Sequence, residues 1–544
     1  MTAQTQAEQV GHASLPSVTL GTRQLGDLEL ILSGAFAPLR GFMTRADVAA
    51  VAASGTLADG TPWPVPVTLE VATDAIGPGA DRVLLADPEG TPLAVLAITE
   101  RADLPGDPGL VQLAGPVTAH RVPEHGSFRR LMLSPAQARA EFGGQPVLAF
   151  ATRAPIGRRQ IGQLKYLSGR LKARVLLLPL TGGPTEVVRQ PESLIRAVLA
   201  AAGSLPPGTL VIPVPLAQRG GRGQPGASGR LAGDPAGSGA GNGGQERDLA
   251  AAAIVAAAHG ATHLMADGWR AAAPDAADGD ELAAVAGLPG SPIPVLPSGD
   301  WAYDPRAEVW RPVTLIEAGT ECDDVSPDQL GDMLDTGAPI PPWVAPEAVI
   351  AELRHARPPR SERGFVLFLT GLSGSGKSTI ARDLRDLLAE RGDRRVSLLD
   401  GDLVRSLLSA GLTFSREDRD LNIARIGYVA AEIAKHGGIA ICAPIAPFEA
   451  ARQRVREMVS QVGDFLLIHV ATPVDVCEQR DRKGLYAKAR AGLIGQFTGV
   501  SDPYEEPADA VLVIDTSTVS REEAAAMVMS MLKDGGWLTA PTPG

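Results

Sequence analysis

Residues 366–379, VLFLTGLSGSGKST, constrain the fold of this chain more than any other stretch. An apolar run, Phe365 to Leu369, leads directly into the spacing G-x-x-x-x-G-K-[ST], which is typical of a phosphate-binding loop between a strand and a helix. Glycines let successive backbone N–H groups converge on phosphate oxygens, and the following helix N-terminus adds partial positive charge. A chance Gly/Ser turn is the alternative, but the strand before the loop and the helix pattern after it favour a domain that binds a nucleoside triphosphate.

The side chains of this loop have separate predicted roles. Lys377 is predicted to reach the β- and γ-phosphates, and the Ser378 hydroxyl is predicted to bind Mg²⁺. The predicted nucleotide-binding set in the loop is Gly371, Ser373, Gly374, Ser375, Gly376, Lys377, Ser378 and Thr379.

Length and charge bound the remaining possibilities. The 544 residues suffice for three or four domains of ~100–200 residues each. There are 50 basic against 62 acidic residues and no basic block, which argues against nucleic acid or an anionic membrane as a partner. The three cysteines lie far apart, without the spacing of a disulfide framework or a zinc site, and fit a reducing compartment. Since neither a signal peptide nor a transmembrane segment is evident, we expect a cytoplasmic protein.

Apolar runs and turn signals divide the chain into regions. Short apolar runs separated by Gly, Pro and Asp, with a hairpin turn at 87–90, predict mainly β structure at first. Alternating strand and helix patterns then predict an α/β domain, which a Gly/Ser/Pro-rich stretch interrupts. The predicted regions are a tail 1–17, a β-rich domain 18–139, an α/β domain 140–353 with a flexible insertion 218–245, a polar linker 354–363 and a last domain 364–544.

The last domain shows the most regular alternation. Buried strand patterns and amphipathic helices follow one another from the phosphate-binding loop onward, which predicts a doubly wound parallel sheet. The predicted strands include 365–370, 396–400 and 465–470, and the predicted helices include 376–391, 418–438 and 447–461.

Several segments of the first two domains resemble ATP sulfurylase (sulfate adenylyltransferase). These segments are GAFAPLRGFM (34–43), DGTPWPVPVTLEV (59–71), VLAFATRAPIGRRQ (147–160), VLLLPLTGG (175–183), GATHLMADG (260–268) and the stretch 319–353. The resemblance implies a β-rich PUA-like N-terminal domain and an α/β nucleotidyltransferase-like middle domain.

The catalytic motifs of that family are altered. In place of Q-x-R-N-P-x-H-x-x-H the chain keeps Arg153 and Pro155, but Gly157 and Gln160 replace both histidines. In place of G-R-D-H-A-G it has DGWRAA (267–272), and Cys322 with acidic neighbours replaces a third family arginine. Because adenylyl transfer to sulfate depends on charge stabilisation at the α-phosphate, we expect little or no sulfurylase activity.

Two alternatives stay open for this altered region. Its arginines, Arg153, Arg158 and Arg159, offer cations that suit a different oxyanion or a regulatory nucleotide. The other alternative is transferase chemistry on a changed substrate.

Four motifs of the last domain together resemble adenylylsulfate kinase over essentially all of 364–534. They are DGDLVR (400–405), FSREDRDLNIAR (414–425), RDRKGLYAKARAG (480–492) and FTGVSDPYEEP (497–507). The resemblance implies ATP and adenylyl sulfate as substrates and Mg²⁺ as cofactor. The order sulfurylase then kinase resembles fused forms that oligomerise, so we expect a homo-oligomer.

The resemblance also implies residue roles. Asp402 orients the acceptor 3′-hydroxyl and acts as base or Mg²⁺ ligand, while Asp400 either caps the loop or assists the metal. Forked guanidinium contacts to the phosphosulfate are implied for three arginines. The implied substrate-binding set is Asp400, Arg405, Phe414, Arg419, Asn422, Arg425, Ile445, Lys483, Gly484, Leu485 and Phe497, and Arg480 is implied to bind ATP.

Within that set, Phe414 and Phe497 sandwich the adenine, with ordinary core packing as the alternative. Lys483, Gly484 and Leu485 begin a lid-like segment that excludes water.

The kinase-like motifs depart from the family at three positions, where Leu403, Ala424 and Ala446 replace Asn, Arg and Ser. These changes bear on the acceptor and leave the phosphoryl-transfer residues in place. We therefore expect an active kinase that converts ATP and adenylyl sulfate to ADP and 3′-phosphoadenylyl sulfate. A first half that retains nucleotidyl transfer and a non-catalytic nucleotide sensor remain as alternatives.

Overall fold

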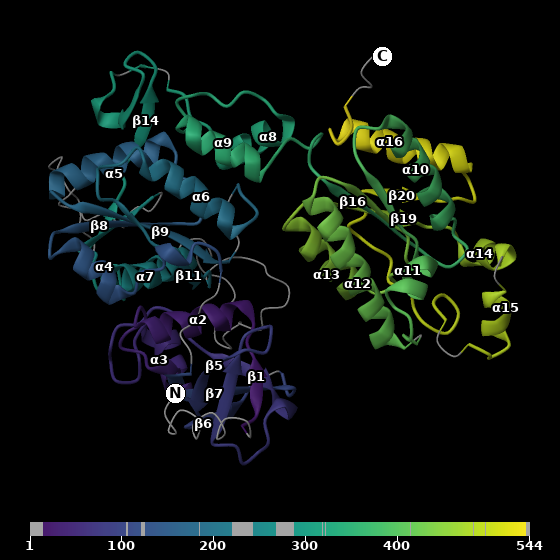
Figure 1. The fold of residues 1–544 in the computed structure, drawn as a ribbon, viewed down its shortest axis with the longest axis horizontal. Helices are drawn as coiled ribbons and strands as arrows, with labels where there is room; N and C mark the ends of the chain where they lie inside the picture. Colours follow the sequence, from purple (N-terminus) through teal and green to yellow (C-terminus); the bar gives the residue numbers. More distant parts are fainter. Residues whose placement is uncertain are drawn as a thin grey trace. The chain divides into compact units, whose positions relative to one another are not determined.

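The chain forms two compact units, and each contains a separate sheet system (Figure 1). The first unit comprises residues 1–327 and 341–352, and the second comprises 328–340 and 353–544. The computed structural model describes residues 15–104, 107–120, 126–183, 185, 187–219, 243–267, 288–317, 319–320, 322–413, 415–481, 484–494 and 497–539. Most of the predicted tail and of the predicted insertion at 218–245 therefore lies outside the described residues.

The first unit begins with a seven-stranded sheet in which β1, β4, β5, β7 and β2 are neighbours, and β3 and β6 also pair with β7. The predicted hairpin turn at 87–90 is confirmed, because β4 and β5 run antiparallel on either side of it. The strands are β1 (Ser17–Thr19), β2 (Gly41–Phe42), β3 (Leu69–Ala72), β4 (Arg82–Ala86), β5 (Pro92–Ala97), β6 (Glu100–Asp103) and β7 (Leu110–Ala119).

Two helices in this region were not predicted. The run from Val18 to Leu32 gives a strand only at its start and then forms α2 (Thr22–Ser33), and α3 (Arg45–Ser54) follows β2. Leu28 and Ile31, which are three residues apart and so lie on one face of α2, are both buried, and the interpretation of this run as mainly β was wrong. Gly26 packs α2 closely on the next sheet, since a Cβ there would lie 2.4 Å from the Pro215 carbonyl oxygen.

The rest of the first unit contains a parallel sheet, as the α/β pattern predicted. Its strands are ordered β10-β9-β8-β12-β13, with β11 also paired to β9, and Figure 1 shows α5 and α6 over one face and α4 and α7 over the other. A hairpin of β14 and β15 packs on α5. The elements are α4 (Pro135–Phe142), β8 (Val147–Thr152), α5 (Arg158–Leu171), β9 (Arg174–Gly182), α6 (Pro191–Ala202), β10 (Leu210–Val211), β11 (Val214–Ala217), α7 (Gly243–Ala258), β12 (His263–Ala266), β13 (Val295–Pro297), β14 (Trp301–Asp304) and β15 (Val309–Pro312).

The second unit is the predicted doubly wound domain. Its five parallel strands are ordered β17-β18-β16-β19-β20, with α10 and α16 on one face and α12 and α13 on the other (Figure 1). The predicted strand and helix limits agree with the structure within three residues. The elements are α8 (Pro327–Thr336), α9 (Glu347–Ala356, which begins in the first unit), β16 (Phe365–Thr370), α10 (Lys377–Arg391), β17 (Val396–Leu399), α11 (Gly401–Leu407), α12 (Arg416–Lys435), β18 (Ile439–Cys442), α13 (Glu449–Ser460), β19 (Asp464–Val470), α14 (Val474–Arg480), α15 (Leu485–Arg490), β20 (Leu512–Ile514) and α16 (Arg521–Asp534).

The segment predicted as a polar linker carries arginines that bind one buried carboxylate of α8. Asp335 accepts hydrogen bonds from Arg357 at 2.7 and 2.9 Å, from Arg360 at 3.2 Å and from Arg363 at 2.5 Å. Arg363 also reaches Asp464 at 3.1 Å. Burial alone would raise the pKa of Asp335, but the hydrogen bonds and charges of Arg357 and Arg363 hold that pKa well below its usual range. The segment is therefore anchored within the second unit.

In the part of the chain that the structure describes, no helix is both long and apolar enough to cross a bilayer.

Candidate functional site

The phosphate-binding loop joins β16 to α10, as the spacing predicted. Gly371, Gly374 and Gly376 have φ angles of 146°, 79° and 102°, in the region that favours glycine. A Cβ at Gly371 would lie 2.4 Å from the Val470 carbonyl oxygen, so a larger residue also has no room. These positions require glycine for both conformation and space.

The loop leaves amide donors available while its carbonyl groups are bound. Within the described residues, the N–H groups of Gly374 and Gly376 donate to no other residue. The Ser375 carbonyl accepts hydrogen bonds from Thr472 at 3.0 Å and Thr516 at 2.9 Å. An arrangement of free amides at a helix N-terminus is an anion-binding arrangement.

Lys377, the first residue of α10, is folded over the loop. Its ammonium donates to the Leu372 carbonyl at 2.6 Å and lies 3.4 Å from the Ser375 hydroxyl. Ser378 and Thr379 follow in the first turn of the same helix. The amine therefore lies beside the loop amides, where a bound phosphate would compete for it.

The predicted ATP-binding Arg480 ends α14 and lies against the loop after β20. It donates to the Thr516 hydroxyl at 2.7 Å and to the Thr516 carbonyl at 2.8 Å. Because Thr516 also binds the Ser375 carbonyl, Arg480 is connected to the phosphate-binding loop through one residue.

Asp402, Arg405, Arg419, Asn422 and Arg425 of the predicted acceptor-binding set lie on α11 and α12, after β17. Asp400 immediately precedes α11, and its backbone carbonyl accepts the Val404 amide at 2.9 Å. Asp402 lies in α11, but its side chain is outside the described part of the structure. Arg405 donates to the Thr413 carbonyl at 3.1 Å, and Arg425 donates to the Leu408 carbonyl at 2.8 Å.

Arg419 and Asn422, one turn apart on α12, carry polar atoms that are buried without a partner. Arg419 pairs with Asp502 and lies 3.1 Å from the Thr498 hydroxyl, yet its Nε has no hydrogen-bond partner. Asn422 is only 6% exposed, and its Oδ1 also has no partner among the described residues. Because buried polar atoms are nearly always bonded, two such atoms one turn apart indicate a ligand site.

The loop after β18, which contains Ile445, is held by residues to which the sequence analysis assigned no role. Thr370 donates to the Ile445 carbonyl at 2.6 Å and contacts the Tyr504 hydroxyl at 3.0 Å. Burial raises the pKa of Tyr504 to about 12, so its phenol stays protonated. Ala446 has a φ of 44°, and the buried Arg452 donates to its carbonyl at 2.9 Å. The PYE motif was the available signal for Tyr504, whereas nothing in the sequence pointed to Arg452.

The lid-like segment is partly described. Gly484, with a φ of 63°, begins α15, and Asp481 accepts the Leu485 amide at 2.8 Å. Phe497 is 8% exposed and packs edge-on to Tyr486 at 5.0 Å, which favours the core alternative for this ring. Phe414 and Lys483 lie outside the described residues.

The altered sulfurylase-like motif lies at the carboxyl edge of the other parallel sheet, and a carboxylate occupies its polar groups. Asp267 accepts hydrogen bonds from Arg159 at 3.1 Å, from Gln160 at 2.8 Å and from Ser298 at 3.2 Å. Arg153 donates to the Leu216 carbonyl at 2.7 Å. Protein acceptors thus take Arg159, Gln160 and the Nη2 of Arg153.

Gly157, which replaces the first family histidine, has no room for a side chain. A Cβ at this position would lie 2.8 Å from the Val344 carbonyl oxygen, closer than real Cβ contacts. The Gly157 amide donates instead to the Gln160 side chain at 3.1 Å, which closes the N-terminus of α5. The backbone therefore fills the space of the lost histidine.

Neither cluster supplies a protein-only metal cage. No group of three or more His, Cys, Asp or Glu side chains is arranged to hold a metal ion among the residues that the structure covers. Mg²⁺ at a nucleotide site takes one or two protein ligands plus phosphate oxygens and water, so the hydroxyl of Ser378 at the start of α10 fits such an ion.

The chain matches known families at both ends. The family described as adenylylsulphate kinase matches residues 363–515, and the PUA-like domain family matches residues 1–104. The chain is 37% identical to the sulfate adenylyltransferase of Phaeosphaeria nodorum, covering 96% of this chain and 94% of that protein. It is 36% identical to the sulfate adenylyltransferase of Aspergillus oryzae with the same coverage.

Among solved structures, the hexameric APS kinase from Thiobacillus denitrificans is similar along nearly the whole length. The TM-score is 0.71 at 33% identity, covering 99% of this chain and 97% of that one. With relatives above 30% identity over nearly their full length, and with a kinase family matched at the second unit, the chain belongs to the sulfate adenylyltransferase family in the form that is fused to an adenylylsulfate kinase domain.

Proposed function

We propose that this protein is an adenylylsulfate kinase, which transfers the γ-phosphoryl group of ATP to the 3′-hydroxyl of adenylyl sulfate. The observation that carries the proposal is the pair of unpartnered buried atoms, Arg419 Nε and Asn422 Oδ1, in the domain that holds the open phosphate-binding loop. The free amides suit the phosphates of a donor nucleotide, and the unpaired buried atoms suit a polar acceptor.

On the donor side, the amides of the loop and Lys377 bind the β- and γ-phosphates of ATP. When ATP binds, the Lys377 ammonium gives up its hydrogen bond to the Leu372 carbonyl and bonds phosphate oxygens instead. The bond to a charged phosphate oxygen is stronger than the bond to the neutral carbonyl. Mg²⁺, held by Ser378 and Asp402 with phosphate oxygens, would neutralise phosphate charge. Arg480 and the segment from Lys483 to Leu485 exclude water from the phosphates.

On the acceptor side, Asp402 orients the 3′-hydroxyl and accepts its proton. The 3′-oxygen forms a bond to the γ-phosphorus while the bond between that phosphorus and the bridging oxygen of ADP breaks. Asn422 hydrogen-bonds the acceptor nucleotide, and Phe414 stacks on its adenine, while Phe497 packs in the core beneath the lid-like segment. The phosphosulfate is bound by Arg405, Arg419 and Arg425, with Ile445 and Asp400 completing the acceptor site.

We also propose that the sulfurylase-like half does not turn over sulfate. The supporting observations are the Asp267 carboxylate, which takes Arg159 and Gln160, and the backbone that fills the space beside Gly157. The neighbour from Thiobacillus denitrificans, similar over the whole chain, is named as a kinase. Its hexameric state supports a homo-oligomer here as well.

A bifunctional enzyme is the second candidate. It is favoured by the names of the fungal relatives, which are sulfate adenylyltransferases and are aligned with 96% of this chain. In that case the first unit would still transfer an adenylyl group to sulfate or to another oxyanion.

One experiment separates these candidates. The full-length protein is incubated with Mg²⁺, ATP and adenylyl sulfate beside Lys377→Ala, and parallel samples receive sulfate and pyrophosphatase instead. The nucleotides are then separated by chromatography. We expect 3′-phosphoadenylyl sulfate only from adenylyl sulfate, and a loss of about 10³-fold in Lys377→Ala. Product from sulfate would establish the bifunctional enzyme, and no product from either substrate would favour a nucleotide sensor.

A further inference from the structure

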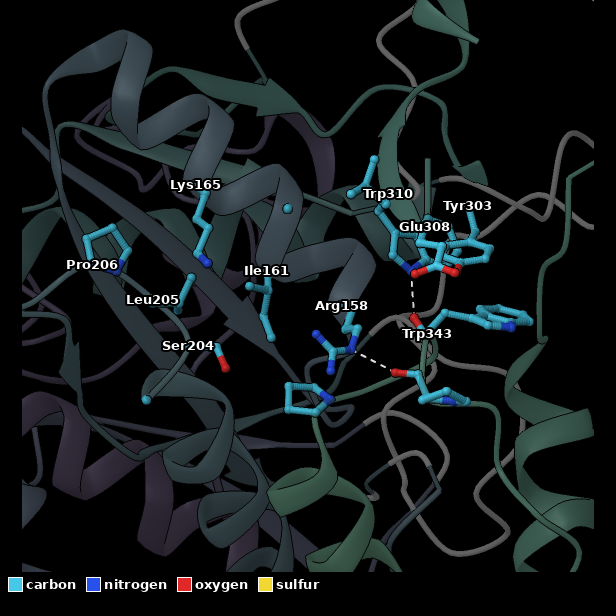
Figure 2. Close-up of a pocket in the computed structure, with 15 residues that line it drawn as sticks. Arg158, Ile161, Lys165, Ser204, Leu205, Pro206, Tyr303, Glu308, Trp310 and Trp343 are labelled. Atoms are coloured by element: carbon cyan, nitrogen blue, oxygen red, sulfur yellow. Dashed lines mark hydrogen bonds between the residues drawn. The ribbon is translucent and has the colours of Figure 1, made fainter. Parts of the chain in front are cut away.

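A cavity of about 840 Å³ in the first unit lies on the side of α5 away from Asp267. Figure 2 shows side chains from α5 facing the turn after α6 and the β14–β15 hairpin across this space. Arg159 and Gln160 of α5 are bound to Asp267, whereas Arg158, Ile161 and Lys165, spaced along one helical face, line the cavity. Apart from Arg158, the cavity is thus lined by residues outside the altered sulfurylase motif at 151–160.

One wall of the cavity is aromatic. Tyr303 and Trp343 stack at 5.1 Å with an interplanar angle of 15°, and Trp310 lies 6.0 Å from Trp343. Trp310 donates to the backbone carbonyl of Trp343 at 2.7 Å, which orients the Trp310 ring, yet all three side chains remain only partly buried. In a chain with 4% aromatic residues, a rigid and partly exposed aromatic wall provides a stacking surface for a planar group.

Cations line the same cavity. The Lys165 ammonium has no hydrogen bond or ion pair within the described residues, and Figure 2 shows it extending toward the turn at Ser204 and Leu205. The Arg158 Nε donates at 2.8 Å to the neutral Pro342 carbonyl, so its charge is not cancelled by a carboxylate bond. These two side chains offer a phosphate the contacts that it prefers.

A single carboxylate faces these cations. Glu308, in the turn of the β14–β15 hairpin, lines the cavity beside the aromatic wall. Within the described residues it makes no hydrogen bond or ion pair. Carboxylates bind ribose hydroxyls in nucleotide sites, and a lone carboxylate beside two cations leaves a net positive cavity.

We propose that this cavity binds a nucleotide, in addition to the nucleotides that the kinase uses. The base stacks on the wall of Tyr303, Trp310 and Trp343, the ribose hydroxyls donate to Glu308, and the phosphate is bound by Arg158 and Lys165. The site is independent of the proposed kinase function, because none of its residues belongs to the second unit.

Adenosine 5′-phosphate, phenyl phosphate and inorganic phosphate are the probes. Each is titrated into the full-length protein, and binding is followed by tryptophan fluorescence and calorimetry. The variant Arg158→Ala/Lys165→Ala is compared with Arg170→Ala, which removes a cation of the same helix that does not line the cavity. The difference between wild type and the double variant isolates the cavity from the kinase site.

We expect adenosine 5′-phosphate to quench the fluorescence of the wild type and of Arg170→Ala, and to bind the double variant about tenfold or more weakly. Glu308→Gln should weaken the binding of adenosine 5′-phosphate but not that of phenyl phosphate, which has no ribose. Equal binding to wild type and double variant would overturn the site. Equal affinity for all three probes would show a plain anion site and would overturn the nucleotide assignment.

Discussion

The two candidate sites of this chain lie at comparable places, each at the carboxyl edge of a parallel sheet, but they differ in how their polar groups are bonded. In the second unit, buried Asn422 Oδ1 and Arg419 Nε lack partners and the loop amides are free. In the first unit, Arg159 and Gln160 share the carboxylate of Asp267. This difference shows that a family motif alone does not provide a ligand-binding site. Its polar groups must also remain available to a ligand.

The largest expected effect is on the free energy of unfolding, and it concerns Asp335, a carboxylate of the second unit whose two oxygens both accept hydrogen bonds. Asp335→Asn removes one of the two carboxylates that balance the cluster of Arg357, Arg360 and buried Arg363, which should lower the free energy of unfolding by about 3–5 kcal/mol. Urea unfolding of the full chain measures this loss. The exposed Asp332→Asn on the same helix is the control and should change little.

The contribution of Asp335 to the free energy of unfolding has a defined pH dependence. Because the folded pKa of Asp335 is depressed, its stabilisation is complete above the unfolded pKa of about 4 and declines as the pH falls toward the folded pKa. The difference between wild type and Asp335→Asn should therefore be constant from pH 8 to about pH 5. A difference that vanished within this range would contradict the bonding scheme.

The second prediction tests whether the unpaired atom at Asn422 serves a ligand. Asn422→Ala should reduce kcat/KM for adenylyl sulfate by about 100-fold, while stability stays the same or rises because an unpaired buried atom is removed. Steady-state kinetics and thermal unfolding measure the two effects. Ser409→Ala, which removes another unpaired buried hydroxyl outside the predicted site, should leave kcat/KM unchanged. If Asn422→Ala lowers stability and spares activity, the atom is structural.

The third prediction tests the closure of the sulfurylase-like site. Gly157→Ala forces a Cβ to 2.8 Å from the Val344 carbonyl and should cost about 1–2 kcal/mol in thermal unfolding. Gly169→Ala in the same helix meets no atom within 4 Å and should stabilise the protein by about 0.5–1 kcal/mol. Equal effects at the two glycines would show that the space beside α5 is open.

The smallest effect is expected at the lid. Tyr486→Phe removes the hydrogen bond of 2.9 Å to the Ser373 carbonyl, which braces the phosphate-binding loop, and should raise KM for ATP by a few-fold, since one such bond contributes about 0.5–1.5 kcal/mol. Tyr428→Phe, at a position that is 64% exposed, is the matched control in an ATP titration. An unchanged KM in Tyr486→Phe would mean that the loop holds its shape without this bond.

The sequence predicted the second unit well because its signals are local. The loop glycines are required by φ angles and close approaches, and the strands around them are continuous apolar runs. The helix α2 was missed because its run, VTLGTRQLGDLELIL, begins with a true strand and turns helical without a strong stop signal.

Long-range pairing is the part that sequence patterns could not supply. Arg159 and Asp267 are far apart in the chain, so the closure of the first site became evident only from their contact. The same holds for the three arginines around Asp335. The roles of Asp402, Phe414 and Lys483 stay predictions, as do the predicted domain boundaries.

The way in which the chain alternates between its two units has a consequence for synthesis on the ribosome. Residues 328–340 belong to the second unit, but 341–352 return to the first. The first unit therefore cannot be completed until the ribosome has already made a piece of the second. That piece carries Asp335, whose arginine partners, 357 to 363, emerge only afterwards. The piece with Asp335 must consequently stay unpaired while the first unit is completed, and a kinase chain begun at residue 364 would lack the buried charge cluster altogether.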